Sequence, residues 1–166
     1  MGTRSTIALE FADGTVQEVY CHWDGYLSHN GAILQEHYLD PFKLRDLIDL
    51  GGLSKLGPEV GVKRPFDNPG KYGSPEYIAF QNLYANQCTF YTRDRGERLQ
   101  VNKFDDYYDY LANHMYEEFE YILRQVNGKA VWFVDCGATG YVPLATVLIN
   151  MKEKQHERDE RLGIRY

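Results

Sequence analysis

A short segment near the N-terminus constrains the fold more than any other part of this sequence. Residues 6–11 and 16–23 are rich in apolar and β-branched residues, as strands are, and Ala12-Asp13-Gly14-Thr15 separates them. An Asp-Gly pair favours a tight turn, because glycine adopts a positive φ without steric cost. The segment therefore predicts a β-hairpin, and with it a small antiparallel sheet that begins at this hairpin.

Capping residues and prolines predict where helices begin. Asp40-Pro41 and Ser74-Pro75 each place a capping side chain before a proline that suits the first helical turn. Apolar residues spaced by three and four predict the strongest helix over residues 104–126. The apolar, β-branched run at residues 130–136 predicts a further strand. The chain is thus expected to form an α+β fold with helices packed on one face of the sheet.

Length and composition narrow the possible classes of protein. The 166 residues, 43% of them hydrophobic, fit a single α+β domain over residues 1–150 and a charged helix or arm over residues 151–166. A net charge of −6 argues against direct nucleic-acid binding. No apolar run approaches the roughly 20 residues of a membrane span. Three cysteines cannot all pair within one chain, which favours a reduced, cytoplasmic setting.

The densest group of chemically versatile side chains is Cys21-His22-Trp23-Asp24-Gly25-Tyr26, at the end of the second predicted strand. His22 and Asp24 would share one strand face, where a carboxylate can fix an imidazole tautomer. Trp23 and Tyr26 can stack on a nucleotide base. The same residues also suit an ordinary turn with Trp23 in the core. His22 and Asp24 could hold a metal or form an acid/base couple. No His and Cys spacing matches a structural zinc site, and we expect neither a metal nor another cofactor.

A second group is Arg93-Asp94-Arg95-Gly96-Glu97. Arg93 and Arg95 can hold a phosphate or carboxylate, because guanidinium groups bind such anions through paired hydrogen bonds. If both arginines met His22 and Asp24, they would form a site for an anionic small molecule such as a nucleotide. The alternative is a charged turn in which the arginines pair with neighbouring acids.

The predicted helix over residues 104–126 is acidic and rich in tyrosine. No lysine or arginine interrupts the stretch that holds Asp105, Asp106, Asp109, Glu117 and Glu120. Such a surface suits a basic groove on a partner protein, and tyrosine is favoured at interfaces. The alternative is an ordinary solvated helix face. The polar segment from residue 151 is a second candidate for contact with a partner.

Several of these segments, taken in order, resemble a family of small uncharacterised proteins of tailed bacteriophages and related mobile elements. The likeness covers residues 2 to about 100 and rests on four segments: Thr3-Arg4-Ser5-Thr6-Ile7, Asp13-Gly14-Thr15, Cys21-His22-Trp23-Asp24-Gly25-Tyr26 and Arg93-Asp94-Arg95-Gly96-Glu97. It extends to Leu34 and Glu36-His37-Tyr38, and it departs at Leu27, where many relatives have proline.

The resemblance implies a setting and no particular reaction. We expect a phage-encoded accessory protein in the cytoplasm of the host cell, which binds a bacterial host protein and inhibits or redirects it, for example a defence factor. The alternative is capture of an anionic small molecule. An enzyme that acts on a phosphorylated substrate, with His22 as acid or base, is the third hypothesis. No catalytic residue is assigned.

Overall fold

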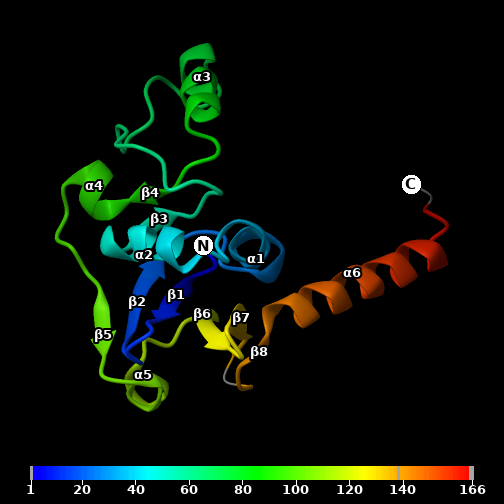
Figure 1. Cartoon of the computed structure of the whole chain (residues 1–166). Helices are drawn as coiled ribbons and strands as arrows, with labels where there is room; N and C mark the ends of the chain where they lie inside the picture. The colour runs from blue at the N-terminus through cyan, green and yellow to red at the C-terminus, as the bar shows by residue number, and fades with distance from the viewer. Residues whose placement is uncertain (1, 138, 165–166) are drawn as a thin grey trace.

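A computed structural model describes residues 2–137 and 139–164. The described chain is built around one mixed sheet of eight strands (Figure 1). The strands are β1 (Ser5–Glu10), β2 (Val16–Cys21), β3 (Leu53–Lys55), β4 (Thr89–Phe90), β5 (Asn102–Phe104), β6 (Phe119–Val126), β7 (Lys129–Asp135) and β8 (Val142–Pro143). The helical elements are a π-helical turn (Leu27–Gly31), α1 (Ala32–His37), α2 (Pro41–Asp49), α3 (Pro75–Leu83), α4 (Tyr91–Arg95), α5 (Tyr107–Asn113) and α6 (Leu144–Arg161).

The strand order is β4-β3-β2-β1-β6-β7-β8, and β5 also pairs with β2. The α+β class and the N-terminal hairpin are confirmed, because β1 and β2 pair antiparallel from Glu10–Val16 to Ser5–Cys21. The prediction of a small antiparallel sheet is wrong. The strand β6 lies parallel to β1, and β3 lies parallel to β2. These parallel contacts join segments far apart in the chain, which local turn signals do not reveal.

Alternating side chains of the central strands point to two faces, and each face has its own core. The larger core packs Ile7, Leu9 and Trp132 against α1, α2 and the start of α6. The smaller core lies on the opposite face, where Tyr110 of α5 packs on Ala8 and its neighbours. The prediction that helices cover one face is therefore wrong, because α5 covers the second face.

Residues 104–126 do not form the predicted helix. They contain the end of β5, the short helix α5, and β6. The carboxylate of Asp106 accepts the Asp109 N–H and caps α5, which ends at Asn113. The following strand β6 lies between β1 and β7. A strand buried on both faces carries consecutive apolar residues, and such a run is easily mistaken for part of a helix.

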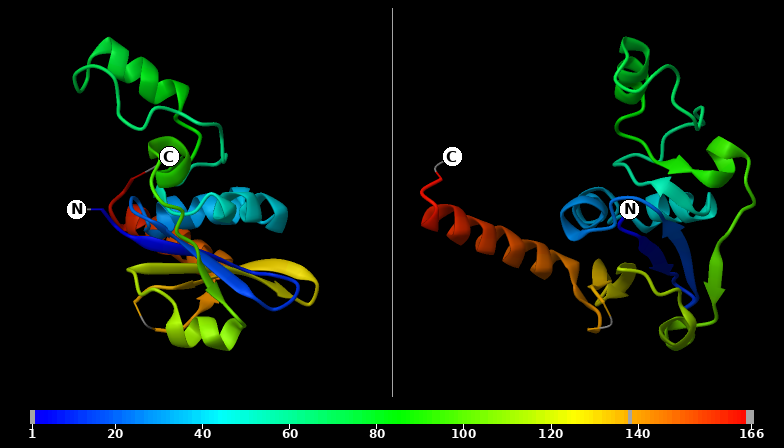
Figure 2. Two further views of the ribbon diagram at one scale, coloured as in Figure 1. Left: turned by 90° about the vertical axis from the view of Figure 1, so that its left-hand side faces the viewer. Right: turned by 180° about the vertical axis from the view of Figure 1, so that it is seen from behind.

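Two segments extend away from the sheet. Residues 58–87, here called the excursion, leave the sheet after β3, carry α3 and return at β4, as Figure 1 and both views of Figure 2 show.

The N-terminal caps of α2 and α3 are confirmed: Asp40 accepts from Phe42 N, and Ser74 accepts from Tyr77 N.

The second extended segment is α6. It starts at the buried Leu144, but residues 149–158 are exposed and the helix projects into solvent (Figure 1). The charged segment from residue 151 thus continues a helix that begins in the domain, and residues 165 and 166 lie outside the described part. Among the described residues, no helix combines the length and apolarity needed to cross a membrane.

Candidate functional site

The loop of residues 22–26, here called the Trp23 loop, follows β2 rather than extending it. Because β2 ends at Cys21 and Asp24 has a left-handed φ of 57°, the prediction that His22 and Asp24 share a strand face is wrong. His22 Nδ1 lies 2.7 Å from the Tyr20 hydroxyl, whereas Asp24 Oδ2 lies 4.0 Å from His29 Nε2. The imidazole and the carboxylate therefore have separate partners.

Buried hydrogen bonds at Gly25 fix the Trp23 loop to the sheet. Gly25 N donates to Thr3 O at 2.8 Å, and Gly25 O accepts from the Tyr121 hydroxyl at 2.6 Å. A Cβ at this position would lie 2.8 Å from Arg4 O, so only glycine allows the Trp23 loop to approach the N-terminal segment this closely. The anchored loop leaves the side chains of Trp23 and Tyr26 exposed.

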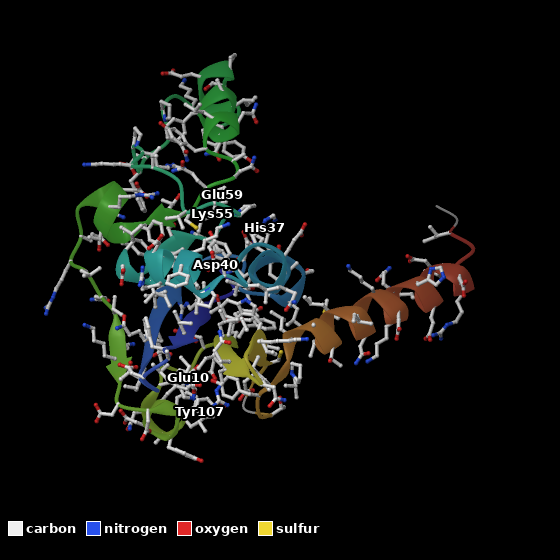
Figure 3. All side chains as sticks on the ribbon, in the orientation of Figure 1. Glu10, His37, Asp40, Lys55, Glu59 and Tyr107 are labelled. Carbon is white, nitrogen blue, oxygen red and sulfur yellow. The ribbon has the colours of Figure 1, made fainter. Side chains whose placement is uncertain are left out.

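Trp23 forms one wall of a hollow of about 300 Å³ between the Trp23 loop and the excursion. Phe66 and Gln81 come from the excursion, and Lys55 lies where the excursion leaves the sheet (Figure 3). Gln81 Nε2 of α3 donates to Asn68 Oδ1, which ties the helix to the loop before it. The hollow thus joins the sequence motif to α3.

Arg93 fastens both ends of the excursion. Its Nη1 donates to Val60 O at 3.0 Å and to Gly61 O at 3.1 Å, while its Nη2 donates to Cys88 O at 3.1 Å. Its Nε also lies 3.0 Å from Asp94 Oδ1. All of these bonds are made within the protein, so this guanidinium acts as a clamp between the start and the end of the excursion.

Asp94 completes the clamp from a buried position. Its Oδ1 accepts from Arg64 N at 3.0 Å, and its Oδ2 accepts from Phe90 N at 2.8 Å. The guanidinium of Arg64 lies over two aromatic rings, Phe80 within α3 and Tyr84 at its C-terminal end. Its Cζ is 4.8 Å from the ring centre of Phe80 and 5.2 Å from that of Tyr84. The segment Arg93-Asp94 and Arg64 together fix the position of α3 relative to the sheet.

The structure brings only part of the predicted ligand site together. Arg95 pairs with Glu97 at 3.3 Å and lies 4.9 Å from the ring centre of Phe66, which also lines the Trp23 hollow. Arg95 therefore contacts a ring that lines the same hollow as Trp23. Arg93 belongs to the clamp, and His22 and Asp24 have their own partners.

The predicted acidic surface is divided among several elements. Asp106 caps α5, and Asp109 Oδ2 accepts the Asp105 N–H at 2.9 Å. Glu117 follows α5, whereas Glu120 lies in β6 and is buried. These five residues do not share one helix face, because residues 104–126 do not form one helix. Asp105 and Asp106 remain exposed at the start of α5.

A buried polar cluster on the α5 side of the sheet was not predicted as a site. It joins Glu18, His114 and Glu120, with Tyr141 donating to Glu120 Oε2 at 3.1 Å and His114 Nδ1 3.6 Å from the same oxygen. Burial raises the pKa of both Glu18 and Glu120. The sequence feature that could have indicated this cluster is Glu18, an acidic residue on the same face of the strand as the apolar residue Val16.

Glu18→Gln is expected to stabilise the protein at neutral pH by about 1 kcal/mol, because it removes a buried charge that lacks a full set of donors. The folded-state pKa of Glu18 is raised, so its contribution to stability is largest below the unfolded pKa and is lost as the pH rises through the folded pKa. His114 and Glu120 face the same carboxyl, and the raised pKa of Glu120 acts in the same direction.

Urea denaturation at roughly pH 5 and pH 7.5 measures this effect, and Glu18→Gln should flatten the difference between the two values. The control is Glu153→Gln on the exposed part of α6. A loss of stability in Glu18→Gln at both pH values would show that the carboxylate stabilises the fold.

The described residues contain no group of three or more His, Cys, Asp or Glu side chains arranged to hold a metal ion. The candidate site is the surface made by the Trp23 loop, its hollow and α3. Comparisons of the chain with models of known protein families, with curated proteins and with solved structures gave no match.

Proposed function

We propose that this is a binding protein whose contact surface combines the Trp23 loop with α3, and that its partner is a bacterial host protein. The observation that supports the proposal is the exposure of α3. None of its nine residues is buried, although Ile78 and Leu83 are apolar and are 50% and 73% exposed. An apolar helix is normally covered, so an exposed one favours a contact with another protein.

The surface is held in place in the free protein. A nine-residue helix has little stability of its own, because helix nucleation is costly. Here Ser74 caps the first turn, and Arg64 stacks on Phe80 and Tyr84. The clamp of Arg93 and Asp94 fastens the ends of the excursion to the sheet. A surface that is ordered in advance loses less entropy on binding.

The exposed side chains suit an apolar groove on the partner. Tyr72, 91% exposed, precedes α3, and Trp23, 43% exposed, lies across the hollow. Aromatic side chains of this kind are the usual anchors of protein interfaces. The resemblance to bacteriophage proteins favours a host protein in the host cytoplasm, such as a defence factor, which the complex would inhibit or redirect. Capture of an anionic small molecule has less support, because Arg93 is bound within the clamp.

Ile78→Asp and Leu83→Asp test this proposal. Each places a charge on the exposed face of α3 and should weaken the host complex by about 30-fold or more, as expected for an interface anchor worth about 2 kcal/mol. The measurement begins with capture of the partner from bacterial lysate and continues with the dissociation constant of the purified pair. Circular dichroism checks that the variants fold.

Two controls separate this surface from the alternatives. Leu162→Asp adds the same charge at an exposed apolar position beyond α6 and should leave the affinity unchanged. A variant with Asp105, Asp106 and Asp109 all replaced by alanine tests the acidic segment and should also bind normally, once circular dichroism shows that it folds without the Asp106 cap of α5. Loss of binding in this triple variant, with full binding by Ile78→Asp, would move the interface to α5. A parent protein that forms only homodimers through α3 would refute a host partner.

A further inference from the structure

The outer edge of β2 contains a gap between two neighbouring strands. Val16 to Glu18 pair with β5, and Cys21 pairs with β3, but neither strand pairs with Val19 or Tyr20 on this edge. A hollow of about 400 Å³ lies at the gap and is lined on one side by Glu97, Arg98, Gln100 and Asn102. Leu99 packs closely on Gly51, where a Cβ would lie 2.7 Å from Leu99 Cδ1, so this wall lies against the turn between α2 and β3.

Glu18 is one of the residues that line this hollow, and the hydrogen bonding of its carboxylate is incomplete. Its Oε1 accepts from Asn102 Nδ2 at 3.1 Å and from Met115 N at 3.0 Å. Its Oε2 is buried and has no hydrogen-bond partner among the described residues. Burying a carboxylate oxygen without a donor is unfavourable, so a ligand that supplies an N–H group would relieve this cost.

The other walls define the charge and shape that a ligand needs. Tyr20 and Tyr91 line the hollow together with the acid Glu97, which also pairs with Arg95 at 3.3 Å. Arg98 is exposed and lines the same hollow. A cation is attracted to aromatic faces and acids, and the net charge of −6 acts in the same sense. Arg98 can in turn hold an anionic group at the other end of the same ligand.

We infer that this hollow is a binding site for a small zwitterionic guanidinium compound of the arginine type. The guanidinium donates to Glu18 and lies against the tyrosine rings, while the ligand carboxylate pairs with Arg98. A guanidinium suits this place better than a simple ammonium, because it is planar, weakly hydrated and stacks on aromatic rings. Met115 also lines the hollow, and its backbone N–H donates to Glu18 Oε1.

The site is separate from the contact surface proposed above. The two hollows share no lining residue, so the binding of a guanidinium compound and the binding of a host protein can succeed or fail independently. The volume of about 400 Å³ is within the usual range for small-molecule sites, roughly 300–1,000 Å³.

Isothermal titration with L-arginine and with agmatine, which lacks the carboxylate, tests this inference. L-Arginine is expected to bind with a dissociation constant on the order of 0.1–1 mM, and agmatine more weakly. Glu18→Gln preserves the shape of the side chain and should weaken both ligands about tenfold or more. Arg98→Ala should weaken only L-arginine, down to the affinity of agmatine.

The matched control is Arg161→Ala, which removes an exposed arginine from the end of α6 and should change neither affinity. Three results would overturn the inference: no heat of binding with either ligand at about ten times the expected dissociation constant, undiminished binding by Glu18→Gln, or an equal loss for both ligands in Arg98→Ala. Arg98 is exposed, so its variant should fold and give an answer even if Glu18→Gln does not.

Discussion

Replacing Asp94 by alanine is expected to lower the free energy of unfolding by about 3–5 kcal/mol, the largest effect of a single polar substitution that we foresee. The Asp94 side chain is fully buried, and that of Arg93 is nearly so. Removal of the carboxylate leaves the Arg93 guanidinium without its counter-charge. It also leaves the N–H groups of Arg64 and Phe90 without their acceptor.

Thermal unfolding should show this loss as a decrease in Tm of roughly 6–20 °C for a domain of this size. Amide hydrogen exchange should increase most in the excursion, because Asp94 anchors this segment to the sheet. Asp46→Ala is the control, since Asp46 is exposed on α2 and should change stability by about 0.5 kcal/mol or less. Unchanged exchange in residues 58–87 would show that the excursion does not depend on the clamp.

Replacing each of the two tryptophans by alanine is expected to affect different properties, stability for Trp132 and binding for Trp23. Trp132→Ala should cost about 3–5 kcal/mol, because it empties a buried position in the larger core. It also removes the indole N–H that Tyr38 O accepts at 3.0 Å. Trp23→Ala should cost about 1 kcal/mol or less, because its ring is largely outside the core, but it should weaken the host complex.

Chemical denaturation of both variants measures the first difference, and titration with the partner measures the second. Trp132→Phe provides a milder core change and leaves Trp23 as the only tryptophan, so its fluorescence reports directly on the hollow. A stability loss in Trp23→Ala as large as that in Trp132→Ala would show that the Trp23 loop serves the fold and would remove it from the contact surface.

The sequence predicted correctly those parts of the fold that depend on turns and helix caps. The hairpin at Asp13-Gly14 and the caps at Asp40 and Ser74 depend on residues within a few positions of each other. The segment 104–126 was misread because β6 acquires its structure from β1 and β7, its neighbours in the sheet. Contacts of that kind override helical spacing and leave little trace in one sequence.

In the candidate site, too, single exposed residues could be predicted from the sequence, whereas contacts between distant segments could not. The exposure of Trp23 and Tyr26 is compatible with their predicted role in binding, and both lie in the most specific motif of the sequence. The clamp role of Arg93 was not foreseen, because its acceptors Val60 and Cys88 belong to the two ends of a loop. Glu18 approaches His114 and Glu120 only when two segments far apart in the chain pack together, so no spacing pattern could reveal the cluster.

The parallel contact of β1 with β6 also has a consequence for the order of folding. Ser5 pairs with Phe119, so one edge of β1 stays unpaired until β6 has been synthesised, much later in the chain. The hairpin of β1 and β2 can form early, but its open edge is available for pairing with other chains in the interval. Long-range pairing of this kind slows folding. We therefore expect that production at low temperature, or with a chaperone that covers nascent strands, will decide how much of this protein is recovered in native form.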